Sequence, residues 1–334
     1  METSPGRLNL YFDYGRSTEA KILRQIGPTY EQSAPIAQAG WFESRRWEEQ
    51  PVRPAAGAAR LIAIYGMSFS NHVGEAMQDL DSSVTVRYIP GPGAPPNHSY
   101  TAFQRDRQNH EAEVVIFGIL ASSLVGLEAN SSMNWGSEFP APYTFPKYTL
   151  QDGELQATPP TIQSLSELRR AVDQGQPWET FVQEMAEQDR FYHPFLFRHN
   201  ALDRSALVRL ARRAWTQRHK QLVTQKIHTS DGFDSDWEQI PVLQQMVRNF
   251  AHDARKDGRL PIVLLLNNQG YADHLAQILE PTLTQAAIPF ISTHTIVPAS
   301  DRHHFANDGH FTKAANRKIA TQVLQLIHSN LSKS

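Results

Sequence analysis

Three side chains of this sequence have the types that acyl-transfer chemistry requires. Ser68 directly follows a run of apolar residues, and Asp308 and His310 stand two positions apart near the C-terminus. A serine hydroxyl becomes a nucleophile when a base within hydrogen-bond reach takes its proton, and a carboxylate then orients that base. Each motif also has a purely structural interpretation, Ser68 as a helix cap and Asp308-Gly309-His310 as a turn. Taken singly, neither motif decides between the two interpretations.

The elements that would position these residues alternate along the chain. Continuous apolar runs, typical of strands buried on both faces, are followed by segments with helical periodicity. The predicted strands are 61–65, 84–89, 114–117, 260–266 and 288–291, and the predicted helices include 71–80, 97–110 and 314–327. This alternation predicts a parallel sheet with helices on both faces. In such sheets the active site lies at the carboxyl ends of the strands, which is where Ser68 falls.

The predicted fold class is therefore α/β, a three-layer α/β/α sandwich with a parallel sheet of about five strands. Residues 58–330 are predicted to form this domain. Residues 1–57 are predicted to be an N-terminal extension, with a short edge strand at 7–12. Residues 130–258 interrupt the alternation and are predicted to be an insertion with a hairpin and helices.

The predicted insertion carries local signals of its own. Gln151-Asp152-Gly153 separates two short strand-like runs, which favours a hairpin. Ser164 followed by Glu167 is a capping box that opens a helix. Residues 201–226 have a long helical pattern that is rich in arginine. That helix is predicted to present a solvated basic face or, as the alternative, a docking surface for an anionic polymer or a partner.

Taken in chain order, these features resemble the SGNH/GDSL hydrolase superfamily of esterases, lipases and carbohydrate O-acyl esterases and transferases. The resemblance covers roughly 58–330: a Gly-x-Ser after the first strand, a glycine loop after the second, a glycine after the third, and Asp-x-His before the last helix. It implies that Ser68 is the nucleophile, His310 the general base and Asp308 the carboxylate that orients His310.

The resemblance also implies an oxyanion hole. Its donors would be the backbone N–H groups of Ser68 and Gly93, with Gly91 as the near alternative. The family's Gly-Asp-Ser motif stands here as Gly66-Met67-Ser68, without the aspartate.

The third family block departs further from the pattern. The family expects Gly-x-Asn-Asp, with an asparagine that donates to the oxyanion, but this chain reads Gly118-Ile119-Leu120-Ala121. Ser122 or Ser123 would supply a hydroxyl donor instead, whereas Asn130 and Asn134 are further along the chain. A lost oxyanion donor costs about 2.7–4 kcal/mol of transition-state stabilisation. The missing asparagine leaves open a weak esterase, a transferase with a remodelled site, or a degenerate member.

The function implied is serine-dependent ester chemistry, either deacetylation or O-acetyl transfer on a carbohydrate through an acyl-Ser68 intermediate. Trp135 and Tyr143, from an aromatic and proline-rich segment, are candidate stacking surfaces for a sugar, although such residues also simply pack. Asn267 is a candidate hydrogen-bonding group for a polar substrate. The first alternative is a non-catalytic polysaccharide-binding module on a degenerate scaffold of the same family.

The second alternative is a metal-dependent hydrolase. His303, His304, Asp308 and His310 lie close together in sequence, and two or three such side chains can bind zinc. The cluster contains no His-Glu-x-x-His motif, and its histidines would otherwise line the rim of the serine site or face water. No metal or other cofactor is expected for the serine-dependent reaction.

The composition restricts the partners. The 32 Lys and Arg residues nearly balance the 34 Asp and Glu residues, so the net charge of −2 gives no electrostatic reason to expect nucleic acid or an anionic membrane surface as partner. No apolar run approaches about 18 residues, so no integral membrane span is expected. The chain has no cysteine, which excludes disulfides and thiolate catalysis. The expected location is cytoplasmic or, if a leader or anchor was removed, periplasmic or in the cell envelope, alongside polysaccharide machinery.

Overall fold

The computed structural model describes residues 12–43, 45–136 and 138–332. The chain forms two compact units. The sheet unit comprises Phe42–Leu127, Tyr148–Thr158 and His228–Ser334, and the helical unit comprises Met1–Trp41, Glu128–Lys147 and Pro159–Ile227. The strand predicted at 7–12 falls almost entirely outside the described residues, and Phe12 itself is helical.

Five parallel strands form the central sheet, in the order β2-β1-β3-β8-β9. Their bounds are β1 Arg60–Gly66, β2 Val84–Pro90, β3 Val114–Leu120, β8 Leu260–Leu266 and β9 Phe290–Ser292. The three central strands, β1, β3 and β8, are buried along almost their whole length, as their continuous apolar sequences predict. The predicted α/β class with a five-stranded parallel sheet is therefore confirmed.

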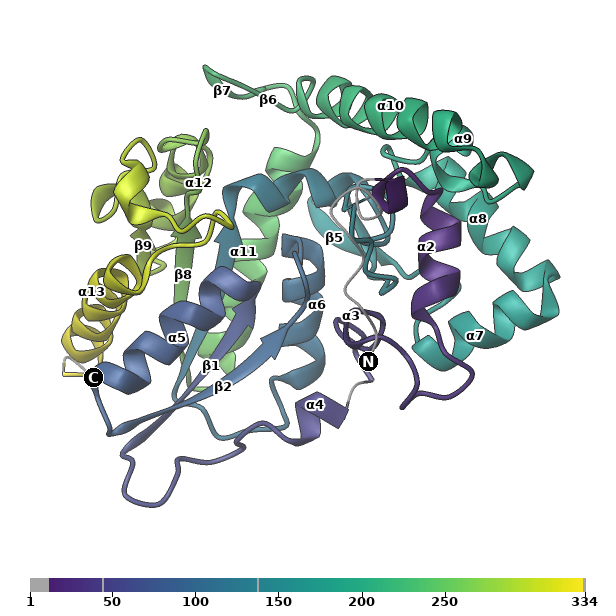
Figure 1. Ribbon diagram of the computed structural model, residues 1–334. Coiled ribbons are helices and arrows are strands. Elements are labelled where there is room, and N and C mark those ends of the chain that lie inside the picture. The colour runs from purple at the N-terminus through teal and green to yellow at the C-terminus, as the bar shows by residue number, and fades with distance from the viewer. Residues whose placement is uncertain (1–11, 44, 137, 333–334) are drawn as a thin grey trace. The chain divides into compact units, whose positions relative to one another are not determined.

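Helices cover both faces of this sheet. On one face α5 (Ser68–Leu80) and α13 (Lys313–Leu331) lie side by side, as Figure 1 shows, and pack on alternate residues of the central strands. The opposite face carries α6 (Pro96–Asp106), α11 (Gln239–Lys256) and α12 (His274–Gln285). Burying both faces gives the sheet a continuous apolar core on each side, which fixes the positions of the strand ends.

A buried polar network anchors α6 to the sheet. Arg87 of β2 forms a two-point contact with Asp106 of α6, at 2.8 Å through Nε and 2.5 Å through Nη2. The Tyr65 hydroxyl donates to Asp106 at 2.9 Å and lies 2.7 Å from Nε2 of His110. Burial lowers the pKa of His110 to about 4, so its imidazole is neutral at pH 7. The paired charges satisfy each other inside the fold.

The order of the strands creates one place where the chain changes direction. From β1 the chain moves outward to β2, and it then returns past β1 to β3 on the other side. The helices that follow β1 and β3 therefore diverge at the carboxyl ends of these two strands. Ligands of open parallel sheets bind in the crevice at such a switch point. The residues that follow β1 and β3 thus occupy the position where a site is expected.

The third strand is longer than the sequence indicates. It was predicted to end at Phe117, but β3 continues through Gly118 to Leu120. Gly118 is accommodated inside the strand because Ser70 of α5 packs directly on it, and a Cβ atom at this position would lie 2.0 Å from Ser70 Oγ. Glycine is therefore needed at position 118 because α5 and the sheet approach closely there, and not because the chain turns.

The other elements of the sheet unit are short. They are α4 Arg45–Glu48, β4 Lys147–Gln151, β5 Glu154–Thr158, β6 His228–Thr229, β7 Gly232–Phe233, and the 3₁₀ helices η3 Thr293–Thr295 and η4 Arg302–His304. The 3₁₀ helix η1, Ala121–Glu128, follows β3. The hairpin predicted around Gln151-Asp152-Gly153 is present as β4 and β5.

The helical unit contains the capped helices that the sequence indicates. Its elements are α2 Thr18–Gln25, α3 Pro35–Gln38, α7 Leu165–Gln174, α8 Gln176–Gln188, α9 Pro194–Phe197, η2 Ala201–Arg204 and α10 Ala206–Thr224. Ser164 caps α7 as predicted, since its hydroxyl accepts from the backbone of Glu167. The second half of the predicted capping box is displaced by one residue, because the Glu167 carboxylate accepts from the backbone of Gln163 and not from that of Ser164. Among the described residues, none of the helices is long and apolar enough to cross a bilayer.

Candidate active site

Ser68 lies at the start of α5, immediately beyond the carboxyl end of β1. Met67 is the N-cap and accepts backbone hydrogen bonds from Ser70 and Asn71, so the helix begins at Ser68. The backbone N–H groups of a first helical turn have no partner inside the helix, and the helix dipole adds partial positive charge there. The Ser68 hydroxyl is therefore held beside donors that suit a developing oxyanion.

His310 reaches Ser68 from the opposite end of the chain. Ser68 Oγ and His310 Nε2 are 2.7 Å apart, although the two residues are separated by 242 positions in sequence. The imidazole ring stacks on Phe69 with a centroid separation of 4.7 Å, and it meets the ring of His72 edge-on at 5.1 Å. These contacts fix the plane of the imidazole, so Nε2 faces the serine hydroxyl.

A tight turn between η4 and α13 carries His310. Phe305 and Phe311 form an antiparallel bridge across the turn, and the backbone of Ala306 donates to the carbonyl of His310 at 2.8 Å. Gly309 completes the turn with φ +86°, a conformation that glycine adopts without strain. The turn interpretation of Asp308-Gly309-His310 and its catalytic interpretation therefore hold together, because this turn sets the direction of the imidazole.

Asp308 contacts both the backbone and the ring of His310. Its Oδ1 accepts from the His310 N–H at 3.1 Å, and its Oδ2 lies 3.2 Å from Nδ1. The second contact is not aligned as a hydrogen bond, since Nδ1 has no hydrogen-bond partner among the described residues. The backbone N–H of His310 holds the pKa of Asp308 below its usual range, so the carboxylate is ionised at neutral pH. Its side chain is 70% exposed, and water therefore weakens its effect on the imidazole.

The turn after β2 carries the two candidate oxyanion glycines. Gly91 accepts a hydrogen bond from the Ala94 backbone, and Gly93 has a left-handed φ of +64°. Gly91 is buried, and a Cβ atom there would lie 2.7 Å from Cε1 of His98, so its need for glycine is explained by packing. Gly93 is only half-buried. Since β2 neighbours β1, this turn and Ser68 share one edge of the sheet.

The end of β3 is linked to the end of β8 through Asn268. The backbone N–H of Ser122 donates to Oδ1 of Asn268 at 3.3 Å. This contact leaves Nδ2 of the half-buried Asn268 side chain available to donate elsewhere. Ser123, the other serine at this position, is buried and its hydroxyl donates to the Leu120 carbonyl at 2.8 Å. The sequence indicates Asn268 only as part of the polar run Asn267-Asn268-Gln269-Gly270 after a buried strand, and the candidate predicted from that run was Asn267.

The three predicted substrate-binding residues are placed differently. Asn267 is fully buried, and its backbone and side chain donate to the hydroxyls of Thr293 and Ser292. It therefore ties β8 to the end of β9 and is not open to a substrate. Tyr143 is fully buried in the helical unit, where burial raises its pKa well above the usual value, so its predicted role as a sugar-stacking surface is wrong. Trp135 of the same unit is half-buried.

The histidine cluster does not assemble into a metal site. His303 is almost fully exposed and contacts Asp301 at 2.9 Å, while His304 Nδ1 is 3.5 Å from the Pro298 carbonyl. Within residues 12–332, with 44 and 137 left aside, no group of three His, Asp or Glu side chains is arranged to hold a metal ion. Of the clustered residues, only Asp308 and His310 come together, and they do so at Ser68.

Comparisons with known proteins add little to this geometry. No family model matches the chain, and no curated protein matches it. One solved structure, of a proposed lipolytic protein of the G-D-S-L family from Desulfitobacterium hafniense DCB-2, aligns over 80% of this chain and 99% of its own. Its sequence identity is 9% and its TM-score is 0.36. A likeness this distant establishes neither the family nor the activity, and the α/β assignment above rests on the sheet itself.

Proposed function

We propose that this protein is a serine-dependent ester hydrolase or acyltransferase of the SGNH/GDSL type. The observation that carries the proposal is the 2.7 Å contact between Ser68 Oγ and His310 Nε2. A serine that merely caps a helix hydrogen-bonds to the backbone of its own first turn. Here the hydroxyl meets an imidazole that a separate turn and an aromatic stack hold in place. That pairing is what activation of a serine nucleophile requires.

The proposed reaction has two steps. His310 Nε2 takes the Ser68 proton as Oγ attacks the acyl carbonyl, and the leaving alcohol then departs with that proton as the acyl-Ser68 ester forms. In the second step His310 takes a proton from water or from an acceptor hydroxyl as that oxygen attacks the acyl carbonyl. The bond between the acyl group and Ser68 Oγ then breaks, and His310 returns the proton to Oγ. This cycle needs a proton on Nδ1 of His310, and the Asp308 carboxylate 3.2 Å away favours that tautomer.

Three donors are proposed for the oxyanion. The backbone N–H of Ser68 lies at the start of α5, and the N–H of Gly93 is favoured over that of Gly91 because Gly91 is buried against His98. We assign the third donor to Nδ2 of Asn268, in place of the family asparagine missing after β3. Anchoring of its Oδ1 by the Ser122 N–H fixes which end of the amide is free.

The proposed substrate class is an O-acylated, in particular O-acetylated, carbohydrate. This follows from the family resemblance and not from a sugar-binding surface, since Tyr143 is buried. Trp135 stays as the aromatic candidate of that segment. The same resemblance favours a place beside cell-envelope polysaccharide machinery, where acetyl groups are added to or removed from sugar hydroxyls.

The test is steady-state turnover of p-nitrophenyl acetate, together with acetate release from acetylated oligosaccharides. Ser68→Ala and His310→Gln are each expected to lower kcat by about 10³-fold or more, with the double variant no worse than either. Ser82→Ala, an exposed serine in the same unit, is the matched control and should keep full activity.

Equal turnover by wild type and Ser68→Ala would contradict the proposal. If oligosaccharide binding then survived the same substitution, the non-catalytic polysaccharide-binding alternative would take its place. If acetate moved to an added sugar rather than to water, the enzyme would be a transferase, because both reactions use the same acyl-Ser68 intermediate.

A further inference from the structure

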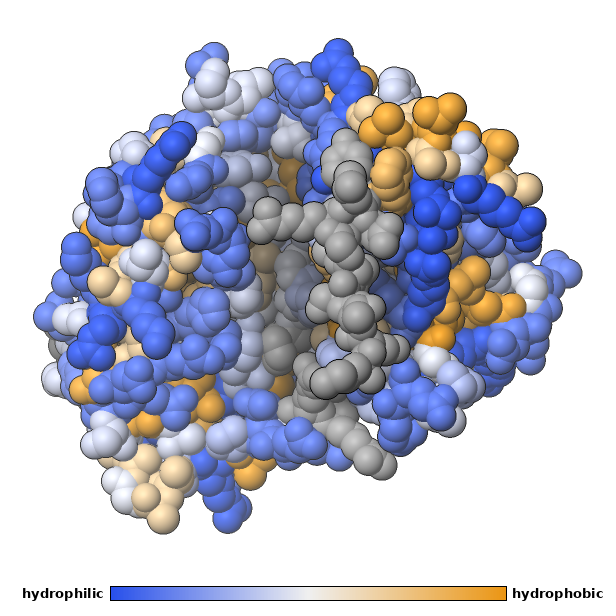
Figure 2. Space-filling view, viewed as in Figure 1, coloured by the Kyte–Doolittle hydropathy of each residue, from blue (hydrophilic) through white to orange (hydrophobic). Residues whose placement is uncertain are grey.

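The outer face of α10 is apolar and open to solvent. Six large apolar side chains on α10 or just before it are exposed: Phe195, Leu202, Leu207, Leu210, Trp215 and Leu222. Figure 2 shows hydrophobic atoms gathered over α9 and α10. Leu207 is 78% exposed, the most of any large apolar residue described. We call these six residues the α10 patch. Exposed apolar patches on soluble units mark interaction surfaces.

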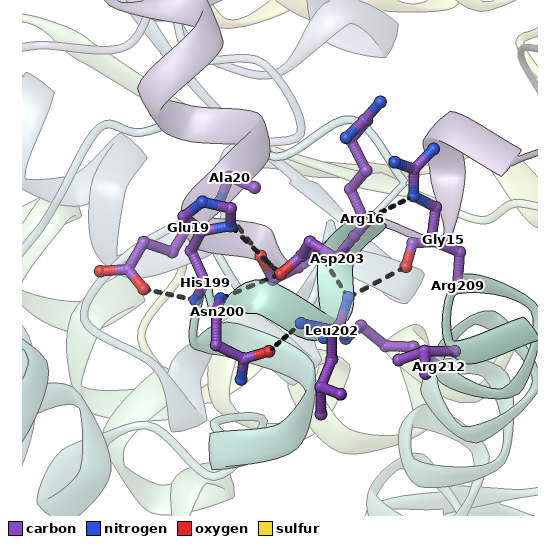
Figure 3. A network of polar contacts seen from close by, with 12 residues as sticks. Gly15, Arg16, Glu19, Ala20, His199, Asn200, Leu202, Asp203, Arg209 and Arg212 are labelled. Carbon is purple, nitrogen blue, oxygen red and sulfur yellow. Dashed lines mark hydrogen bonds and ion pairs between the residues drawn. The ribbon is translucent and has the colours of Figure 1, made fainter. Parts of the chain in front are cut away.

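The inner face of the same helix is charged. Arg212 is 1% exposed and donates to Asp203 at 2.7 Å and to the carbonyl of Phe195 at 2.9 Å. Arg209 donates to the Asp203 backbone at 2.5 Å, and the Ser17 backbone donates to the Asp203 carboxylate at 2.8 Å. Figure 3 shows Asp203 at the centre of these contacts. Arg212 is therefore buried beside a carboxylate partner, although its Nη2 has no hydrogen-bond partner among the described residues.

This arrangement inverts the usual amphipathic helix. A surface helix normally turns its apolar stripe toward the core and its charges toward water. In α10 the apolar positions 207, 210, 211, 214 and 222 recur at helical spacing and all are exposed. The helix is attached to its unit through ion pairs and hydrogen bonds, which leaves the apolar stripe for another surface. The basic face predicted from the sequence thus points inward in part.

Cations border the patch. Arg204, Arg218 and Lys226 are exposed, and none of them has an ion-pair partner among the described residues. The sequence of α10, Ala206–Thr224, contains no aspartate or glutamate. One carboxylate, Glu138, lies beside the helix, where it contacts Arg213 and Gln217. The exposed cations Arg204, Arg218 and Lys226 therefore outnumber it, and the border attracts an anionic surface.

We propose that the α10 patch docks on an anionic lipid surface, with α10 lying in the plane of the headgroups. Helices of this kind place Leu, Phe and Trp among the acyl chains while Lys and Arg contact the headgroup phosphates. The free cations supply charge complementarity to anionic lipids. This proposal is independent of the reaction at Ser68.

The experiment is flotation of the full-length chain with vesicles of phosphatidylcholine alone or mixed with phosphatidylglycerol. Wild type should float with the anionic vesicles, and added salt should weaken the binding. Leu207→Asp/Leu210→Asp should lower the bound fraction about ten-fold or more, because it places charge in the apolar layer. Val52→Asp, at an exposed apolar residue of the other unit, should bind like wild type.

A second measurement does not depend on the stability of the double variant. Brominated lipids should quench tryptophan fluorescence of wild type, and Trp215→Phe should bind equally but lose most of that quenching. Absence of flotation, equal flotation of the double variant, or salt-insensitive binding to both vesicle types would overturn the proposal. A different result would also overturn it: wild type is a dimer by light scattering and does not bind vesicles, whereas the double variant is a monomer. The patch would then join two copies of this chain.

Discussion

At the scale of single residues, the site depends on how strongly each side chain is held. Ser68 and His310 are fixed by helix, turn and aromatic contacts, so their 2.7 Å contact is a built feature. Asp308 differs, because its carboxylate is mostly exposed and reaches Nδ1 at 3.2 Å without hydrogen-bond alignment. A buried orienting aspartate contributes about 10⁴-fold to kcat in well-studied serine hydrolases. An exposed one contributes less, since water and salt screen its charge.

Asp308→Asn is therefore expected to lower kcat only about ten-fold, and added salt should narrow the difference from wild type. The chain supplies a matched control in Asp301→Asn. Asp301 has the same Asp-x-His contacts, accepting from the backbone of His303 at 3.0 Å and lying 2.9 Å from its ring, but that histidine does not touch Ser68. The control should turn over like wild type. A 10³-fold loss in Asp308→Asn would mean that the carboxylate acts as a fully coupled third member.

At the scale of elements, the segments that follow β1, β2 and β8 must supply the proposed oxyanion donors together. Asn268 follows β8, and the Ser122 backbone at the end of β3 holds its side chain in place. Asn268→Ala and Asn268→Asp should each lower kcat by about 10²–10³-fold, the usual loss for one oxyanion donor. The Asn268→Asp side chain can still accept from the Ser122 N–H but has no N–H to donate to the oxyanion. It therefore distinguishes a role as oxyanion donor from a role in holding Ser122.

Gln269→Ala, at the exposed neighbouring residue, is the control for this pair and should be silent in the same turnover assay. Full activity of Asn268→Asp beside an inactive Asn268→Ala would show that Asn268 only positions η1. In that case the third oxyanion donor would have to be sought elsewhere.

The turn that carries His310 gives a second prediction at this scale. Gly309 and Gly57 both have φ +86°, and nothing lies within 4 Å of a Cβ atom added at either position. Replacing either by alanine should therefore cost a similar free energy of unfolding, about 1 kcal/mol. Only Gly309→Ala should also lower kcat, because strain in its turn shifts the imidazole. Thermal unfolding and turnover of both variants check this, and equal turnover would mean that the turn tolerates strain without moving His310.

The sheet was largely predictable from sequence, since short continuous apolar runs bounded by turn residues are typical of strands buried on both faces. The hairpin and the helix caps were predictable for local reasons, at Asp152-Gly153 and at Ser164 with Glu167. Long-range contacts could not be predicted from the sequence. The spacing of apolar residues does not indicate that Ser70 packs on Gly118, or that Asn268 contacts Ser122. Aromatic residues were ambiguous for a similar reason: the sequence does not distinguish a tyrosine buried in the core, as Tyr143 is, from one that stacks on a sugar at the surface.

At the scale of the whole molecule, the net charge of −2 conceals two separate arrangements of charge and polarity. The residues proposed for catalysis, Ser68, Asp308, His310, Gly93 and Asn268, all belong to the sheet unit. The exposed apolar face of α10 and its cationic border belong to the helical unit. Asp189, a buried carboxyl group with a strongly raised pKa, belongs to the same unit. The overall composition is an average over both units. It therefore gives no sign of the proposed catalytic site in one unit or of the exposed apolar face of α10 in the other.

The helical unit should lose stability as the pH rises. Burial raises the pKa of Asp189 to about 7, against the donors Asn134 and the Phe191 backbone, which lower it. The unfolded chain releases this proton near its ordinary pKa of about 4, so folding is penalised progressively between about pH 4 and 7. The full penalty, on the order of 4 kcal/mol, is present above the folded-state pKa.

Asp189→Asn is therefore expected to flatten the decline of the thermal midpoint between pH 5 and pH 8 by about half or more. Asp173→Asn, at an exposed aspartate of α7, should keep the wild-type slope. The midpoints are followed by circular dichroism across the pH series. Parallel slopes for wild type and Asp189→Asn would mean that the buried carboxyl is ionised throughout the range.

The central claim, that Ser68 is an activated nucleophile, is tested most directly by intact-mass analysis after treatment with a fluorophosphonate. Wild type and Ser82→Ala should each gain one adduct, Ser68→Ala should gain none, and His310→Gln should react much more slowly, because its amide cannot take the Ser68 proton. No adduct on wild type, or the same adduct on Ser68→Ala, would contradict the account, since the 2.7 Å contact with His310 would then not activate the hydroxyl.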